Sequence, residues 1–479
     1  MNRLYYGDNL DVMRQHLPDE SVDLVYLDPP FNSGRNYNAI FKAGGKAGTA
    51  QIKAFTDTWT WDKAAAVALD NILKAGGALA HAMEAFSALL GQGSTLAYLS
   101  MMAPRLQEIR RVMKDTASVY LHCDPSASHY LKILMDAIFG KKNFRNEVVW
   151  CYDTAGRTKR QWNQKHDLLL FYSRSKKWGF NETRVERRNR TEGWERWYPH
   201  QDDDGRYYQF DGKGYKYYAD AGKLANDWWD DLPALHAHRN PERLGYPTQK
   251  PLVLLDRIIK ASSNPGDVVL DPFCGCGTAV DAAQGLDRKW IGIDITHLAI
   301  GVMRKRLNDK YGADCKFKVI GEPKDLAGAK QLASDDTHQF EHWALGLVGA
   351  RASAKGKGGD KGIDGILLMD PEEGCKVSRQ VPISVKSGNV NVGMIRDLRG
   401  VMTRDSSPIG ILVTLKPPTK GMKAEALAAG FYEASGLEGL FGDHIPCIQI
   451  LSVENLLAGT AKAQIPALAM NQTHKRARK

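Results

Sequence analysis

The sequence predicts an α/β protein built around a Rossmann-like, doubly wound sheet, with a second α/β domain towards the C-terminus. Short apolar runs of strand length alternate with stretches at helical spacing. Several of these runs end in aspartate, which places carboxylates at the strand ends where open α/β sheets bind their ligands. A polar, alanine-rich connector then begins near residue 324. We therefore expect one domain over residues 1–330 and another, with a basic tail, over 335–479.

Length and charge narrow the class of protein. The chain has 479 residues, seven cysteines and a formal net charge of +10. The charge favours a polyanionic partner, nucleic acid first, although an ordinary basic protein is the alternative. An odd number of scattered cysteines indicates reduced thiols. The sequence has no signal-peptide pattern and no run of about 20 apolar residues, so we expect a cytoplasmic protein.

The first strand–helix–strand unit ends in the most informative motif. Arg3 to Tyr6 predicts a strand followed by Asp8, and the apolar run 22–27 predicts a buried strand that ends at Asp28-Pro29-Pro30-Phe31. The Asp28 carboxylate and the Pro29 carbonyl can accept hydrogen bonds from an exocyclic amine while Phe31 stacks on a planar base. A plain strand-to-loop turn is the alternative.

The elements that follow complete half of a sheet. Residues 32–94, rich in glycine and alanine, resemble an excursion from the sheet that could cover the site. Helices are expected over 98–113 and 130–139, and strands over 118–122, 147–150 and 168–172. We expect structural roles for the histidines of this half, because no metal-ligand spacing links them. They are His122, His129 and His166.

Composition changes between about residues 155 and 245. Arginine and lysine there interleave with tryptophan and tyrosine, as in Trp194-Glu195-Arg196-Trp197-Tyr198. Basic groups hold phosphates, and aromatic rings or arginine stack on bases. We favour a DNA-contacting region over an irregular β subdomain that uses the aromatics as a small core.

A second motif follows another predicted strand. The run 268–270 ends at Asp271-Pro272-Phe273-Cys274-Gly275-Cys276-Gly277-Thr278, and a helix follows at once. Glycines at this spacing let the backbone approach a ligand at a helix N-terminus. Seventeen residues after Gly277, the next strand ends in Asp294, which suits ribose hydroxyls. The third glycine of the dinucleotide fingerprint is missing, so a nucleoside ligand without a pyrophosphate fits better than NAD.

Together these residues resemble the S-adenosylmethionine-dependent DNA amino-methyltransferases of the β class. The D-P-P-F motif comes first, the target-recognition region next and the F-x-G-x-G motif last, which implies a circularly permuted sheet over residues 1 to about 320. In that family Asp28, Pro29, Pro30 and Phe31 would form the catalytic motif that binds the target amine and packs on the flipped base.

The resemblance also implies the cofactor site. The loop of residues 273–278 would lie under the methionine part of S-adenosylmethionine, Asp294 would bind the ribose and Asp8 the adenine. Thr248 and Lys250 would close over the cofactor's carboxylate. The implied cofactor-binding positions are Asp8, Thr248, Lys250, Asp271, Phe273, Gly275, Gly277, Thr278 and Asp294.

The methyl acceptor is expected to be an amine, because transfer to carbon 5 of cytosine would need a cysteine nucleophile, and the one Pro-Cys pair, Pro446-Cys447, lies far outside this domain. Aspartate at the first motif position is commoner in adenine-N6 enzymes, and serine leans to cytosine-N4. We therefore expect an adenine-N6 methyltransferase that acts on double-stranded DNA, with cytosine-N4 as the alternative. A homodimer is one assembly that the sequence leaves open.

The C-terminal part resembles the Mrr-like branch of the PD-(D/E)xK nucleases. There Asp364 would bind Mg²⁺, Glu341 would support the metal and Lys386 would orient or activate water. Ser384, however, stands where the superfamily usually has Glu or Gln, and a neutral hydroxyl is a poor Mg²⁺ ligand. A working nuclease and a domain that only binds DNA are equally favoured. A nuclease whose methylase half serves as a sequence reader, or an RNA methyltransferase, would be the competing classes.

Overall fold

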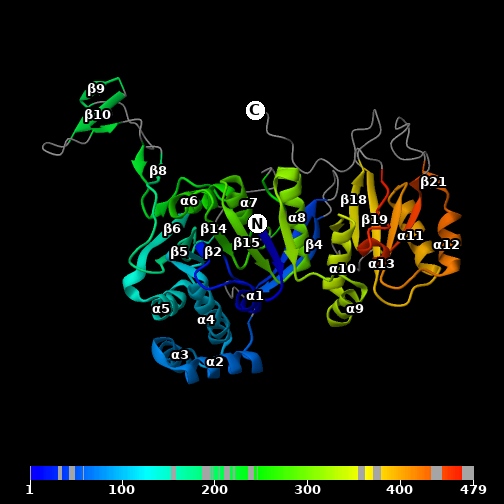
Figure 1. Cartoon of the computed structure of the whole chain (residues 1–479), viewed down its shortest axis with the longest axis horizontal. Coiled ribbons are helices and arrows are strands. Elements are labelled where there is room, and N and C mark those ends of the chain that lie inside the picture. The colour runs from blue at the N-terminus through cyan, green and yellow to red at the C-terminus, as the bar shows by residue number, and fades with distance from the viewer. Residues whose placement is uncertain are drawn as a thin grey trace.

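The computed structural model describes most of the chain. The described residues are 2–30, 35–42, 49–57, 59–152, 158–185, 196, 198–203, 205–209, 216–218, 222–235, 242–244, 246, 248–353, 362–369, 379–432 and 445–465. Two larger sheets, each with helices packed on both faces, organise these residues (Figure 1). This confirms the predicted fold class.

The larger sheet has nine strands in the described ranges, ordered β13-β6-β7-β5-β2-β14-β15-β1-β16. Strand β7 runs antiparallel to both of its neighbours, whereas the other pairings are parallel. The strands are β1 Asn2–Tyr6, β2 Val22–Leu27, β5 Met113–Cys123, β6 Phe144–Cys151, β7 His166–Ser173, β13 Trp228–Trp229, β14 Val268–Asp271, β15 Lys289–Asp294 and β16 Phe317–Ile320. The N-terminal strand β1 therefore pairs with strands that come late in the chain, as the predicted permutation requires.

Helices cover both faces of this sheet because successive residues of its strands point to opposite sides. On β2, for example, Val25 packs with one layer of helices and Leu24 with the other. The first layer is α1 Asn9–His16, α2 Lys63–Ala75, α3 Gly77–Leu90, α4 Ser94–Val112 and α5 Ser128–Phe139. The second is α6 Leu252–Ser262, α7 Thr278–Gly285 and α8 His297–Tyr311.

The stretch predicted as an excursion contains ordinary packed structure. Strands β3 Arg35–Lys42 and β4 Thr49–Asp57 pair with each other, and α2 and α3 follow. Leu69 of α2 and Met83 of α3 are buried in the core beside α4 and α5. The alanine-rich sequence therefore forms part of the helical layer under the sheet.

The region from about 155 to 245 contains short strands. They are β8 Arg184–Val185, β9 His200–Asp202, β10 Gly205–Gln209, β11 Lys216–Tyr218 and β12 Lys223–Leu224. Strands β9 and β10 stand well apart from the main sheet (Figure 1). On their small sheet, Tyr207 packs on Tyr218 and Lys216 lies 4.7 Å from the ring centre of Tyr207.

The second sheet has the order β17-β18-β19-β20-β23. Its strands are β17 Arg351–Ala352, β18 Gly365–Met369, β19 Arg379–Lys386, β20 Gly410–Thr414 and β23 Ile448–Ser452, and a separate pair is β21 Phe431–Tyr432 with β22 Ile445–Pro446. Helices α9 Leu326–Asp335, α10 Thr337–Leu347 and α13 Val453–Leu457 share one core with it. Helices α11 Gly393–Arg404 and α12 Lys420–Leu427 pack on its other face.

The core of the second sheet extends into the first part of the chain. Phe340 and Trp343 of α10 belong to the same buried cluster as Leu298 of α8 and Cys276 of the glycine turn. In addition, the backbone N–H of His297 donates to the side-chain oxygen of Gln339 at 2.9 Å. The C-terminal part therefore packs directly behind the glycine turn.

The helices and the cysteines bear on the expected environment of the chain. None of the helices in the described ranges combines the length and the apolar character that crossing a membrane requires. The cysteines in these ranges are all free thiols, and Cys274 and Cys276 are buried in the turn.

Candidate active site

Four neighbouring parallel strands bring aspartates to one edge of the larger sheet. Strands β2, β14, β15 and β1 lie side by side in that order. Asp28 follows β2, Asp271 and Asp294 end β14 and β15, and Asp8 follows β1. Two motifs separated by more than 200 residues in the sequence therefore meet at the edge where such sheets bind ligands.

The two carboxylate oxygens of Asp28 have different surroundings. Oδ2 accepts from the ammonium of Lys250 at 2.6 Å, and the two side chains are only 15% and 10% exposed. Oδ1 is buried and, among the described residues, has no hydrogen-bond partner. Pro29 is buried and Pro30 is half-buried beside it, whereas Phe31 lies outside the described residues. Because an unpaired buried acceptor is costly, Oδ1 is suited to a donor supplied by a ligand.

Buried Asp271 and half-buried Asp294 form a second pair of carboxylates. Burial, together with the negative charges of Asp28 and Asp294, raises the pKa of Asp271 well above its usual range. Burial also raises the pKa of Asp294 to about 6, although its oxygens accept from Gly275 N–H and from the backbone and hydroxyl of Thr296. This edge of the sheet is therefore rich in hydrogen-bond acceptors and in potential negative charge.

The glycine turn between β14 and α7 depends on left-handed backbone at two positions. Gly275 has φ +50° and Gly277 has φ +76°. A Cβ at Gly277 would lie 2.5 Å from Cγ of Met303, and one at Gly275 would lie 3.3 Å from the Tyr246 ring. Half-buried Phe273 donates its N–H to Asp271. The left-handed backbone and the lack of room for a Cβ explain why glycine occupies these two positions.

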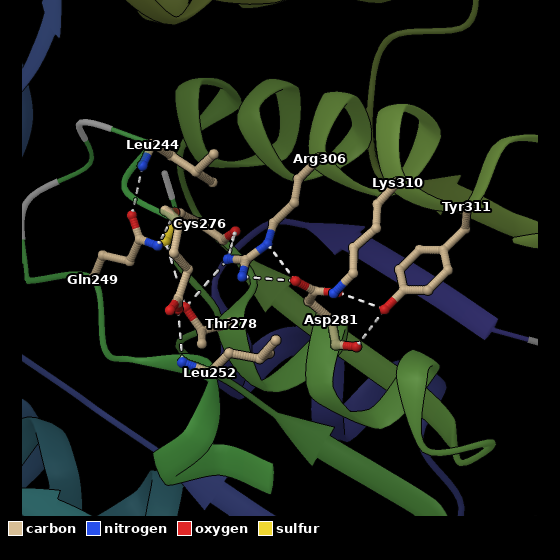
Figure 2. Close-up of polar contacts among 10 residues, drawn as sticks. Leu244, Gln249, Leu252, Cys276, Thr278, Asp281, Arg306, Lys310 and Tyr311 are labelled. Carbon is tan, nitrogen blue, oxygen red and sulfur yellow. Dashed lines mark hydrogen bonds and ion pairs between the residues drawn. The ribbon is translucent and has the colours of Figure 1, made fainter. Parts of the chain in front are cut away.

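A buried ion pair supports the turn from behind (Figure 2). Arg306 of α8 binds Asp281 of α7, and these side chains are 4% and 2% exposed. The same guanidinium donates to the carbonyl of Cys276 and to the hydroxyl of Thr278, both at 3.3 Å. Lys310 and Tyr311 also bind Asp281 (Figure 2). The start of α7 is thus held by charged groups that the solvent barely reaches.

A third segment, residues 242–252, brings Lys250 to the site. The side chain of Gln249 accepts from Leu244 N–H at 2.9 Å and donates to the carbonyl of Glu242 at 2.8 Å (Figure 2). The carboxylate of Glu242 accepts from Leu252 N–H at 2.7 Å and so caps α6. Thr248 has φ +57°, a conformation that is uncommon for a residue other than glycine. These hydrogen bonds connect the described residues of the segment on both sides of Lys250.

Asp8 has partners that the sequence did not reveal. Its Oδ1 accepts from Leu10 N–H and caps α1, and its Oδ2 binds Arg105 of α4 at 2.5 Å. Arg105 also binds Asn9, whose amide donates to the carbonyl of Pro272. Asp8 therefore ties α1 to α4 next to the glycine turn, and an adenine contact by this residue remains a prediction.

A polar network beneath β2 was also missed. His122 is buried and bonds to Tyr26 through Nδ1 and to Asp167 through Nε2, each at 3.0 Å. Burial acts to raise the pKa of Asp167, but His122, the charge of Lys250 and a hydrogen bond from Tyr152 outweigh it and hold the pKa at about 2. This agrees with the structural role expected for His122. The pairing joins residues 45 or more positions apart, so no local pattern could indicate it.

In the C-terminal part, the structure brings together three of the predicted residues. Oδ2 of Asp364 accepts from the Ser384 hydroxyl at 3.2 Å and from Val385 N–H, and it lies 3.6 Å from the Lys386 ammonium. Glu341 of α10 pairs with His338. Among the described residues, no group of three or more His, Cys, Asp or Glu side chains is placed to hold a metal ion. A magnesium site at Asp364 and Glu341 is therefore still a prediction.

Comparison with known proteins agrees with this geometry. Residues 22–301 match the family of N6/N4 DNA methylases, and residues 332–433 match the Mrr-type restriction endonuclease family. The chain is 26% identical to the type II methyltransferase M.EcaI of Enterobacter cloacae, over 64% of this chain and 69% of that protein. It is 25% identical to the DNA adenine methyltransferase YhdJ of Escherichia coli K12, over 66% and 86% of the two chains. A solved structure of the cytosine-N4-specific PvuII DNA methyltransferase aligns with a TM-score of 0.39 and 13% identity, over 66% and 89%.

The sheet and the aspartates at its carboxyl edge define an α/β protein with a candidate ligand site at the strand ends. More specifically, the chain belongs to the N6/N4 DNA methylase family and also contains a restriction endonuclease-like domain.

Proposed function

We propose that this protein transfers a methyl group from S-adenosylmethionine to the exocyclic amine of a base flipped out of double-stranded DNA. The observation that carries the proposal is the position of Asp28. It follows a central strand beside the glycine turn, and its Oδ1 is a buried acceptor without a partner among the described residues. An amine N–H supplies the missing donor.

The residues at this edge fit S-adenosylmethionine. When bound, this cofactor supplies an electrophilic methyl group on a positively charged sulfonium. The acidic residues at this edge, Asp28, Asp271 and Asp294, offer oxygen atoms that can face such a charge, and Asp294 at the end of β15 can accept from ribose hydroxyls. Residues 273–278 would hold the methionine part, with Asp8 near the adenine and Thr248 near the carboxylate.

The protein's own part in the chemistry is to bind and orient the amine. One N–H donates to Oδ1 of Asp28 and the other to the carbonyl of Pro29, which directs the nitrogen lone pair out of the plane of the ring. Fixing that direction towards the methyl group converts a bimolecular encounter into an oriented one. Phe31 would pack on the base. Asp28 is also the nearest acceptor for the proton that the amine loses.

Adenine N6 is the proposed acceptor. The first residue of the motif is aspartate, and one relative of this chain is named a DNA adenine methyltransferase. Cytosine N4 is the second candidate, because it offers the same donor chemistry to the same two acceptors.

For the C-terminal domain we propose DNA binding first and cleavage second. Asp364 is buried and its Oδ2 is already shared by Ser384, Val385 and Lys386. If Mg²⁺ binds, Asp364 and Glu341 would be ligands and Lys386 would orient water. Free thiols and a DNA substrate are consistent with a cytoplasmic protein, which is the location that we propose. The assembly that we propose is a homodimer.

The proposed function is tested by measuring transfer of radioactive methyl groups from S-adenosylmethionine to unmethylated plasmid DNA. We expect Asp28→Ala to lower the rate by about 100-fold to 1000-fold, the loss typical when one group that orients or stabilises a reacting centre is removed. Asp19→Ala, which removes an exposed carboxylate outside the site, is the matched control. An Asp28→Ala variant with the rate of the wild type would overturn the proposal and favour a nuclease that uses this half as a sequence reader.

A further inference from the structure

The ion pair between Lys250 and Asp28 gives the two oxygens of the Asp28 carboxylate different surroundings. Oδ2 is 2.6 Å from the ammonium, whereas Oδ1 is buried without a partner in the described part of the chain. Rotation of the carboxyl group would exchange these oxygens, so the ammonium fixes which one stays available. The two residues are 222 positions apart, and the pair therefore depends on the fold as a whole.

Lys250 is itself held firmly. Gln249, the residue before it, bridges Leu244 and Glu242, and Glu242 in turn caps the helix that begins two residues after Lys250. Thr248 adopts a left-handed backbone conformation. The side chain of Lys250 is only 10% exposed. Its ammonium reaches Asp28 from a segment whose described residues are hydrogen-bonded to one another.

Several acidic and phenolic groups lie close to Asp28 and Lys250. Asp271 on β14 and Tyr26 on β2 both interact electrostatically with Asp28, and Asp167 on β7 interacts with Tyr26 and Lys250. The charge of Lys250 acts to lower the pKa of both Asp167 and Asp271, although burial dominates at Asp271. Without this ammonium, the two oxygens of Asp28 would lose the ion pair that now distinguishes them.

We propose that Lys250 is a positioning residue for methyl transfer, whose ammonium holds Oδ2 of Asp28 and so turns its Oδ1 towards the target amine. The proposal rests on the proposed function of the same site. It adds a role for Lys250 in the capture of the base, beyond the contact with the cofactor's carboxylate that the family resemblance implies.

The test uses the full chain, unmethylated plasmid DNA and S-adenosylmethionine. The variants are Lys250→Met, Lys250→Gln, which keeps a donor without the charge, and Lys250→Arg, which keeps the charge. Lys260→Met changes an exposed lysine of α6, the helix that follows Lys250, and is the control. Circular dichroism selects folded variants, isothermal titration with S-adenosylmethionine measures cofactor affinity, and initial rates at saturating S-adenosylmethionine give kcat.

We expect kcat at neutral pH to fall about 100-fold in Lys250→Met and Lys250→Gln, the size of effect that misplacing a reacting group produces. Lys250→Arg should recover most of the activity, and cofactor affinity should change by less than about threefold in each variant.

Three outcomes would overturn the inference. A loss confined to cofactor affinity, with normal kcat at saturation, would make Lys250 only a cofactor ligand. A loss that Lys250→Arg does not recover would make its role structural. Wild-type kcat in Lys250→Met would show that Asp28 needs no ammonium. By contrast, a wild-type protein that transfers no methyl group at all would refute the proposed function itself, so the two failures are distinguishable.

Discussion

Replacing Gly277 with alanine should damage the glycine turn in a measurable way. Gly277 precedes α7 with φ +76°, and a Cβ there would lie 2.5 Å from Cγ and 2.8 Å from Sδ of Met303. The substitution therefore imposes two separate costs: a left-handed backbone on a residue with a side chain, and the displacement of a fully buried methionine.

The magnitude follows from these two costs. A left-handed conformation costs roughly 1–2 kcal/mol for an ordinary residue. Overpacking of a dense core adds about 1–3 kcal/mol. We therefore expect Gly277→Ala to lower the free energy of unfolding by about 2–5 kcal/mol.

Urea denaturation followed by tryptophan fluorescence measures this loss. Gly301→Ala is the matched control, because Gly301 lies within α8 and a Cβ there would meet nothing within 4 Å. Alanine in that helix should be neutral or stabilising by up to about 1 kcal/mol. If Gly277→Ala unfolds at the same urea concentration as the wild type, the turn does not depend on glycine as argued.

Three further predictions concern the supports of the site. Arg306→Met should lower the free energy of unfolding by about 3 kcal/mol, because it removes the buried cation that pairs with Asp281 and leaves that carboxylate with Tyr311 and the more exposed Lys310. Lys74→Met, in an exposed pair, should cost less than about 0.5 kcal/mol; equal losses in urea denaturation would contradict this. Because burial raises the pKa of Asp294 from 3.8 to about 6, this residue makes unfolding easier as pH rises through that interval, and the effect is complete above it. The wild type should therefore lose more stability over that interval than Asp294→Asn, and parallel pH curves would refute the assignment. Trp343→Ala should cost about 3–5 kcal/mol, since Trp343 belongs to the core shared with the glycine turn; a thermal or urea midpoint equal to that of the wild type would show that the shared core contributes little.

Much of the sheet was predictable because its signals are local. Each of the runs that end at Asp28, Asp271 and Asp294 has the apolar composition of a buried strand and ends in a residue suited to a loop. Glycine at positions 275 and 277 also suits the positive φ angles that the structure has there. The structure confirms these elements and brings the three aspartates to one edge.

What the sequence could not reveal are contacts between distant segments. The ammonium of Lys250 reaches Asp28 only because α6 and β2 pack in the same domain, and Arg105 reaches Asp8 from the other helical layer. The helices α2 and α3 were missed for a different reason. They lie in a stretch that was interpreted from its glycine-rich and alanine-rich composition. Tertiary packing against α4 determines which of their residues are buried.

The most direct test of the account is mass spectrometry of nucleosides from unmethylated plasmid DNA incubated with the full chain and S-adenosylmethionine. Asp28→Ala, shown to bind the cofactor, serves as the reference. The account predicts N6-methyladenine with the wild type and almost none with the variant. N4-methylcytosine would keep the mechanism and overturn the choice of base. No methylated base, despite intact cofactor binding, would contradict the assignment of this edge of the sheet to methyl transfer.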